Sequence, residues 1–359
     1  MRIGLDIRKA FDEYGGMSVV AYQFTTYFID LLNKNGYEYT IFPHRLREWK
    51  SMQFIEPFIQ ELIWKQAILP FEILIRDINV MIYTYPLVPL VATKPSIIFI
   101  YDMQYWEEPS ERSFTNRFVL SMVKFSALRS NKIITISQFV KKSIIKYLRI
   151  NSEKIVVAYP GYEHVILNGN THSHIPHNKY ILTVLGTFAK RKNAISLLKA
   201  YSLLPNDIRS TYKLVIVASK KGPEWPHVQE TILNLGLNKN IVITGHISKE
   251  ELISLYRHAE MLVHPVVYEG FGLPVLEAMA IGTPVIAGNK TSIPEVAGDA
   301  ALLVDPNDAR ELSIAILKLI QDDSLREELR EKGIVRSRKF SWKRMAETVL
   351  RALKEVMEN

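Results

Sequence analysis

The chain has 359 residues, of which 48% are hydrophobic and 23% charged, and its formal net charge is +8. This length exceeds what a single hydrophobic core usually organises, so two domains are expected. The absence of cysteine excludes disulfides, thiolate metal sites and a cysteine nucleophile. The charged first residues argue against a signal peptide, and the prolines within the most apolar region, 78–102, argue against a membrane-spanning helix. We therefore expect a soluble, cytoplasmic protein that contacts a membrane at most peripherally.

Short β-branched runs alternate with longer amphipathic segments along the whole chain. The first series of predicted strands comprises Ile3–Ile7, Tyr39–Phe42, Val80–Tyr83, Ser96–Tyr101, Lys132–Ile136 and Ile155–Ala158. The second series comprises Tyr180–Gly186, Lys213–Ala218, Ile241–Thr244, Met261–His264, Pro284–Ala287 and Ala301–Val304. Helical patterns such as 194–203, 249–259 and 274–280 lie between them. Such alternation predicts an α/β fold with two doubly wound parallel sheets.

The two series are separated by residues 167–179, which are rich in Asn, Gly, His and Pro and have no periodicity. We therefore predict an N-terminal domain over 1–170 and a second domain over 171–340. The remaining residues, 341–359, form a helix with no strand after it, and we expect this helix to pack back on the first domain. The histidines near the break have no regular ligand spacing and no accompanying carboxylate, which favours a solvated linker over a metal site. These histidines are His164, His172, His174 and His177.

The most informative segment runs from Tyr268 to Ala280, after a buried strand and into a helix. Its glycines allow the backbone to approach a ligand closely, and the free N–H groups at the start of a helix favour a phosphate. Glu269 precedes the helix and Glu277 lies about one turn into it, so both carboxylates can face a bound ligand, with Glu277 accepting hydrogen bonds from ribose hydroxyls. The structural alternative is that Glu277 pairs with a cation and Glu269 caps the helix.

A second charged element, Lys190-Arg191-Lys192, lies between a strand ending near Gly186 and the helix starting at Ala194. Three cations at a helix N-terminus repel the positive end of the helix dipole unless an anion binds there. The pattern favours a phosphate site, and a solvated run of charges is the alternative.

The first domain offers two candidate segments after its strands. Gly15-Gly16 precedes a predicted helix and, by itself, indicates a flexible turn. Tyr101-Asp102 ends a predicted strand, where ligands of open α/β sheets bind.

Basic residues dominate the stretch 112–149, which contains nine of them and no acid. The nine are Arg112, Arg117, Lys124, Arg129, Lys132, Lys141, Lys142, Lys146 and Arg149. The stretch predicts either two amphipathic helices with solvated basic faces or a surface for anionic lipid headgroups or a phosphorylated acceptor. No nucleic-acid-binding motif accompanies the charge, so nucleic acid is not expected as a partner.

The segment around Glu269 and Glu277 resembles the donor-site signature of family-4 retaining glycosyltransferases. Flanking residues extend the resemblance, as in Val263-His264-Pro265 before it and Pro294-Glu295-Val296 after it. The resemblance implies a GT-B fold, in which two Rossmann-like domains face a central cleft. The first domain would then be the acceptor side and the second would bind a nucleotide sugar.

The resemblance also assigns roles to the candidate residues. Arg191 and Lys192 would hold the donor diphosphate, Glu269 would position hydroxyls of the donor sugar, and Glu277 would hold the ribose. Relatives commonly have histidine where this chain has Tyr101, and several have arginine near the position of Thr187. The further residues implied in the donor site are Gly15, Gly16, Gly186, Thr187, Ile247, Gly270, Phe271, Gly272 and Leu273, and Tyr101 and Asp102 are implied on the acceptor side.

The reaction implied is transfer with retention of anomeric configuration, in which positive groups stabilise the departing diphosphate. No Asp-x-Asp motif is present, so neither a metal nor another cofactor is expected. The paired acids alone suggest double displacement, whereas the resemblance implies attack from the leaving-group face. Further resemblance to bacterial mannosyltransferases of surface polysaccharides implies GDP-mannose as donor and a glycan or lipid-diphosphate-linked acceptor. The alternatives are a UDP- or dTDP-sugar donor, a nucleotide-sugar-binding protein without transfer activity, and an epimerase or phosphorylase of the same fold.

Overall fold

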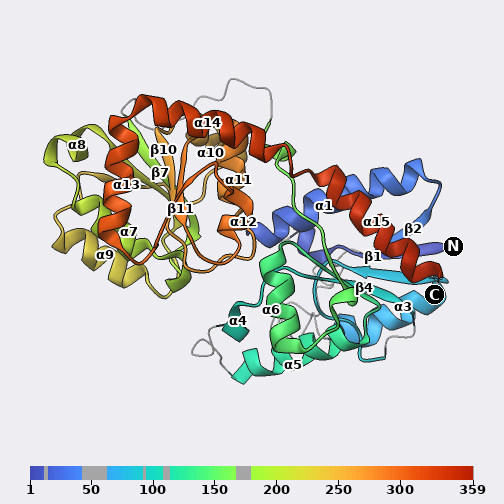
Figure 1. Cartoon of the computed structure of the whole chain (residues 1–359). Coiled ribbons are helices and arrows are strands. Elements are labelled where there is room, and N and C mark those ends of the chain that lie inside the picture. Colours follow the sequence, from blue (N-terminus) through green and yellow to red (C-terminus); the bar gives the residue numbers. More distant parts are fainter. Residues whose placement is uncertain (12–14, 43–62, 92–93, 108–113, 167–178, 359) are drawn as a thin grey trace. The chain divides into compact units, whose positions relative to one another are not determined.

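A computed structural model describes residues 1–11, 15–42, 63–91, 94–107, 114–166 and 179–358 (Figure 1). The chain divides into two compact units, one formed by Met1–Gly161 with Trp342–Asn359 and the other by Tyr162–Ser341. Within the predicted break, residues 167–178 lie outside the described residues, as do His172, His174 and His177.

A six-stranded parallel sheet organises the first unit, with strand order β2-β1-β3-β4-β5-β6. Its strands are β1 (Arg2–Asp6), β2 (Glu38–Phe42), β3 (Val80–Tyr83), β4 (Ser96–Ile100), β5 (Lys132–Thr135) and β6 (Ile155–Val157). Its helices are α1 (Gly16–Lys34), α3 (Leu69–Ile75), α4 (Gln104–Glu107), α5 (Phe114–Arg129), α6 (Gln138–Leu148) and α15 (Trp342–Glu358). Short helical turns are η1 (Arg8–Phe11), η4 (Trp64–Ile68, a π-helix) and η6 (Ser152–Lys154). Every residue of β3 and β4 is buried, as expected for parallel strands that are covered on both faces.

The last helix belongs to this first unit. Its buried side chains recur at helical spacing from Trp342 through Met345, Val349 and Leu353, so one face is apolar. This face packs against α1, which lies beside α15 in Figure 1, and against β5. Lys132 forms an ion pair with Glu355 at 2.6 Å.

The second unit has its own six-stranded parallel sheet, with strand order β12-β11-β10-β7-β8-β9. Its strands are β7 (Tyr180–Thr187), β8 (Lys213–Ser219), β9 (Ile241–Ile243), β10 (Met261–His264), β11 (Val285–Gly288) and β12 (Leu302–Val304). Its helices are α7 (Ala194–Ser202), α8 (Asn206–Thr211), α9 (Trp225–Asn234), α10 (Lys249–His258), α11 (Leu273–Ile281), α12 (Ile293–Ala297), α13 (Ala309–Gln321) and α14 (Asp323–Ser337), with turns η7 (Glu163–Val165) and η8 (Lys190–Lys192).

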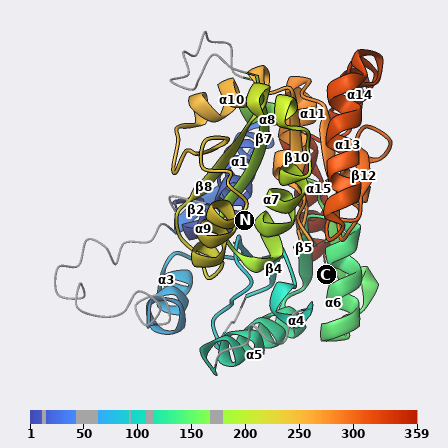
Figure 2. The same ribbon diagram turned by 90° about the vertical axis from the view of Figure 1, so that its left-hand side faces the viewer.

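One face of this sheet packs on α7, α9 and α13, where Ile181, Val263 and Ile286 enter a common core. Helices α10 and α11 pack against each other, and α11 also contacts β10 and β11. Helices α13 and α14, labelled on the right of Figure 2, are in contact. A capping box between Ser248 and Glu251 fixes the start of α10. The predicted fold class, two doubly wound α/β sheets, is confirmed.

Candidate functional site

An ion pair between buried Lys192 and half-buried Glu269 joins the two segments that the sequence singled out. The Nζ atom of Lys192 donates to Oε2 of Glu269 at 2.8 Å, and Nη1 of Arg191 lies 3.5 Å from the same oxygen. Burial by itself favours neutral Glu269, but the charges of Lys192 and Arg191 outweigh it and lower the pKa of Glu269 to about 2. Glu269 is therefore an anion near neutral pH, able to accept hydrogen bonds.

The cations are held in place by the backbone that follows β7. Lys190–Lys192 form the turn η8, and Asn193 has a left-handed conformation with φ of 54° before α7 begins. The side-chain amide of Asn193 donates to the carbonyls of Pro265 and Pro306, at 3.1 and 2.6 Å. The N–H of Val267 donates to the Arg191 carbonyl at 2.9 Å. These hydrogen bonds connect the loop after β7, which carries the cations, to the loops after β10 and β12.

The glycine segment after Glu269 leads directly into α11. Gly272 precedes α11 with φ of 104°, and a Cβ atom added there would lie 2.5 Å from Cδ1 of Ile293. The backbone conformation therefore favours glycine here, and a larger residue would also displace the Ile293 side chain. Gly270, Phe271 and Leu273 are buried around it, and no side chain caps the start of α11 among the described residues.

Glu277 is held by two side chains that the sequence analysis did not connect with it. His164 Nε2 lies 3.0 Å from Oε1 of Glu277, and the Tyr256 hydroxyl donates to Oε2 at 2.9 Å. Burial and the Glu277 carboxylate raise the pKa of Tyr256 well above its ordinary value, so the phenol stays protonated. Each Glu277 oxygen keeps a lone pair for a further hydrogen bond. His164 belongs to this contact, although the sequence analysis placed it beside the linker.

His264 ends β10 and is fully buried. Neither ring nitrogen has a hydrogen-bond partner among the described residues. Burial lowers the pKa of His264 to about 4, with Glu269 acting in the opposite direction. The sequence analysis named His264 only as a strand end and as a flank of the family resemblance, and it did not predict a buried neutral imidazole.

The other predicted donor-site residues of this unit lie at strand ends. Gly186 and Thr187 are the exposed last residues of β7, where the ladder to β8 is irregular and Gly186 has φ of 75°. Ile247 is half-buried in the connection from β9 to α10. The structure places these residues without assigning them a ligand.

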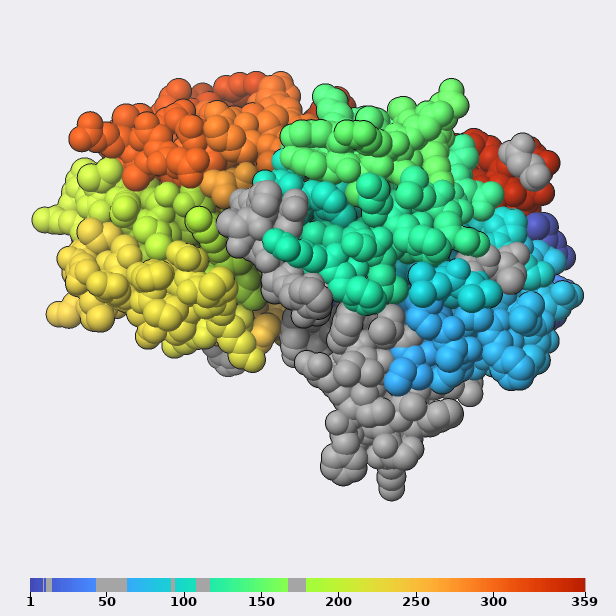
Figure 3. All heavy atoms as spheres, turned by 90° about the horizontal axis from the view of Figure 1, so that it is seen from below, coloured from blue at the N-terminus to red at the C-terminus, as the bar shows by residue number. Residues whose placement is uncertain are grey.

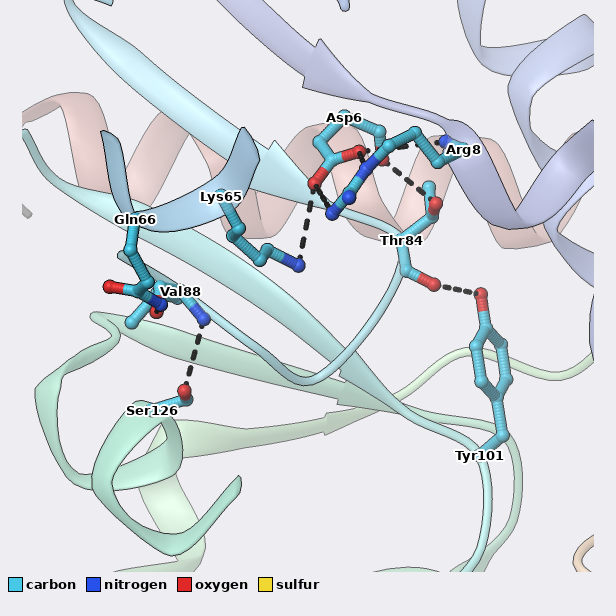
Figure 4. Close-up of polar contacts among 8 residues, drawn as sticks. All are labelled: Asp6, Arg8, Lys65, Gln66, Thr84, Val88, Tyr101 and Ser126. Atoms are coloured by element: carbon cyan, nitrogen blue, oxygen red, sulfur yellow. Dashed lines mark hydrogen bonds and ion pairs between the residues drawn. The ribbon is translucent and has the colours of Figure 1, made fainter. Parts of the chain in front are cut away.

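In the first unit, Gly15 and Gly16 are exposed at the start of α1, whose first residue is Gly16. Tyr101 is buried, and its hydroxyl donates to the Thr84 carbonyl at 2.9 Å (Figure 4). Burial raises the pKa of Tyr101, which keeps the phenol protonated. Oδ1 of Asp102 accepts from the Gln104 N–H at 3.2 Å. In this structure the Tyr101 hydroxyl therefore donates its hydrogen bond to the backbone of its own unit.

Figure 4 also shows a buried charge cluster at the end of β1. Arg8 Nε lies 2.8 Å from Oδ1 of Asp6, and Lys65 Nζ lies 3.5 Å from Oδ2. Burial alone would raise the pKa of Asp6, but Arg8 and Lys65 hold it below its ordinary value. The Arg8 guanidinium also lies over the Trp64 ring at 4.3 Å from its centre. The sequence analysis did not predict this cluster.

No group of three or more His, Cys, Asp or Glu side chains suited to a metal occurs in the described part of the chain. Across the same residues, no helix combines the length and the hydrophobicity that crossing a bilayer requires.

Comparison with known proteins adds to this geometry. The family model for glycosyl transferases group 1 matches residues 154–336, just over half of the chain. O-antigen chain mannosyltransferase B of Escherichia coli is 36% identical over 230 residues, which span 62% of this chain and 60% of that relative. O-antigen chain mannosyltransferase RfbU of Salmonella typhimurium is 26% identical over 294 residues, covering 81% of this chain and 79% of that protein.

The fold also matches solved structures. Sucrose-phosphate synthase from Thermosynechococcus elongatus superposes with a TM-score of 0.79 at 18% identity, covering 100% of this chain and 99% of that one. This match confirms the predicted GT-B architecture of two Rossmann-like units. The residues matched by the family model include Lys192 and Glu269, and the chain belongs to the glycosyl transferases group 1 family.

Proposed function

We propose that the chain is a retaining, metal-independent glycosyltransferase that moves mannose from GDP-mannose to a glycan or lipid-diphosphate-linked acceptor during surface polysaccharide synthesis. Residues 171–340 would bind the donor and residues 1–170 the acceptor. The retaining outcome rests on the resemblance of the Glu269 segment to family-4 enzymes. Metal independence rests on the lack of an Asp-x-Asp motif.

The observation that carries the proposal is the ion pair of Lys192 and Glu269 beside the uncapped start of α11. Lys192, Arg191 and the first amides of α11 supply positive charge where a departing diphosphate gains negative charge. Glu269 supplies a fixed anion that can accept hydrogen bonds from sugar hydroxyls, and Glu277 has acceptor capacity for a ribose. The names of the two relatives support mannose as the sugar.

A donor screen tests this function. GDP-mannose at a hundred times its Kd is expected to stabilise the protein by about 2.7 kcal/mol, because it binds only the folded state. UDP-glucose and dTDP-rhamnose are expected to stabilise it less. With a mannan acceptor, GDP should be released at the same rate with and without EDTA, and NMR of the product should show the α-anomer. A stronger response to a UDP- or dTDP-sugar, or a β-linked product, contradicts the proposal.

Tyr101 supports one second candidate, a nucleotide-sugar-binding protein without transfer activity. Its hydroxyl is bound to Thr84, and it occupies the position where relatives commonly have a histidine near the reactive sugar. Donor-dependent stabilisation without release of GDP, in the presence of acceptor, would favour this candidate.

We also propose that the protein acts in the cytoplasm at the inner membrane surface, through the basic stretch 112–149. Arg112 lies outside the described residues. Lys132 forms an ion pair with Glu355, and Lys141 donates a hydrogen bond to the Ile155 carbonyl, both within the first unit. The exposed basic residues of the stretch are Arg117, Lys124, Arg129, Lys142, Lys146 and Arg149, and Phe118, Leu128 and Ile145 are exposed with them. Figure 3 shows the green residues of this stretch along one face of the first unit.

Replacing Arg117 and Lys124 by alanine tests the membrane contact. Each basic residue near an anionic surface contributes about 1 kcal/mol, so partitioning onto phosphatidylglycerol vesicles is expected to fall ~30-fold. Co-sedimentation at low salt measures this change. The matched control replaces Lys343 and Lys354, which are exposed on α15 of the same unit. Equal binding to neutral and anionic vesicles would refute the membrane contact.

A further inference from the structure

Thr291 has an unusual backbone conformation close to the ion pair. Its φ is 57°, in the left-handed region that β-branched residues rarely adopt. Such conformations persist only where the surrounding structure imposes them, and they occur often at functional sites. The reason for this one lies in what Thr291 and its neighbours contact.

Thr291 and Ser292 hold the two polar groups of the Glu269 backbone. The Glu269 N–H donates to Oγ1 of Thr291 at 3.2 Å, and Oγ of Ser292 donates to the Glu269 carbonyl at 2.8 Å. Ser292 is fully buried, which shields its hydrogen bond from competing water. The left-handed turn at Thr291 lets two consecutive side chains reach opposite groups of one residue.

The next residue continues the contact. Ile293 lies so close to Gly272 that a Cβ atom there would approach its Cδ1 to 2.5 Å. The segment Thr291–Ile293, after β11, therefore holds the chain after β10 at both Glu269 and Gly272. The cationic side of the ion pair is fixed separately, through Asn193 and the carbonyls of Pro265 and Pro306.

We propose that Thr291, Ser292 and Ile293 are positioning residues for sugar transfer, which set the Glu269 carboxylate against Lys192 by holding the Glu269 backbone. The proposal rests on the proposed function in one respect, the role of Glu269 at the donor sugar. A group that must meet the transition state needs a fixed backbone, since a misplacement of about 1 Å can cost ~10²-fold in rate.

The test compares Thr291→Val, Ser292→Ala and the double variant in the full chain. Thr291→Val keeps the β-branched shape and loses the acceptor, and Thr291→Ser keeps the hydroxyl. The expected kcat of the double variant is ~10–100-fold below wild type, with KM for GDP-mannose changed less than threefold, because the diphosphate contacts are untouched. Thr291→Ser should stay within threefold of wild type. Circular dichroism confirms that each variant is folded.

A matched serine separates positioning from general stability. Ser337 is also buried, and its Oγ donates to the Ile334 carbonyl at 2.8 Å, the same length as the Ser292 bond. Ser337→Ala should lose comparable stability and keep its kcat. If Ser337→Ala lowers kcat as much as Ser292→Ala, or if the double variant keeps its kcat, the proposal is overturned.

A second readout does not depend on transfer activity. Carbon-13 NMR of the Glu269 carboxyl should show its pKa, about 2 in the intact protein, rising in the double variant as the carboxylate moves away from Lys192. If the wild type transfers no sugar, the proposed function fails, and this titration still decides the positioning role. An unchanged Glu269 titration would overturn that role.

Discussion

Replacing Lys192 by methionine is expected to lower the rate of sugar transfer by ~10²–10³-fold, the loss typical when one preorganised charge-stabilising group is removed. Lys192 is buried and donates directly to Glu269, so the change removes a positive charge and loosens the anion beside it. Lys190→Met is the matched control, because Lys190 is an exposed residue of the same turn. Release of GDP from GDP-mannose in the presence of acceptor measures the rate. Equal rates for Lys190→Met and Lys192→Met would contradict the role of Lys192.

The same variant separates the ion pair's effect on stability from its effect on catalysis. Removing one partner of a buried pair costs about 3–5 kcal/mol when the other is left uncompensated. The cost here should lie toward the lower end, because Arg191 stays 3.5 Å from Glu269. The double variant Lys192→Met, Glu269→Gln should regain stability, since a neutral amide replaces the anion that has lost its closer cation, and stay inactive. Urea unfolding of the single and double variants gives the coupling free energy.

The fold was largely predictable because its parallel strands are buried runs of β-branched residues. β4 is apolar from Ile97 to Ile100, and the capping box of α10 is a local signal that can be read directly from the sequence. The ends of elements were less exact: the strand predicted from Pro284 begins at Val285. Proline has no N–H to donate to a sheet ladder, which accounts for the difference.

The site was predictable only where a local motif carried the signal. Glu269 and Lys192 each stood in such a motif, but their 2.8 Å contact joins residues 77 positions apart. His164 and Glu277 are 113 positions apart, and no spacing rule connects them. Thr291 looked ordinary in sequence because its left-handed backbone is imposed by tertiary contacts. Long-range pairing of polar groups decides these details, and single-sequence patterns do not encode it.

His264 is expected to make the protein sensitive to acid in a defined pH window. The folded state keeps its imidazole neutral down to a pKa of about 4, whereas the unfolded chain binds a proton below its ordinary pKa of 6.5. As the pH falls, the proton therefore favours the unfolded state, and stability is lost from about pH 6.5 to about pH 4. Over this window the loss amounts to about 3 kcal/mol, at 1.36 kcal/mol for each pH unit.

His264→Asn should flatten this window, since asparagine does not titrate. His227→Asn is the control, because it makes the same substitution at an exposed histidine of α9. Urea unfolding at half-unit steps of pH measures the slope, and hydrogen exchange of the peptide covering β10 locates it. A slope in His264→Asn equal to that of the wild type would refute this origin of the acid sensitivity.

The pH range in which His264 lowers stability can be separated from the pH range in which Glu269 does so. The pKa of Glu269 is lowered from 4.5 to about 2, so the stability gained from its ionisation is present above pH 4.5 and is lost between about pH 4.5 and pH 2. Replacing His264 should therefore change the profile above about pH 4, and replacing Glu269 by glutamine should change it below about pH 4.5. His264, which stays neutral, and Glu269, which stays charged, thus lower the stability of this unit over two different pH ranges. A single transition that both replacements abolish together would instead mean that the two groups titrate as one coupled pair.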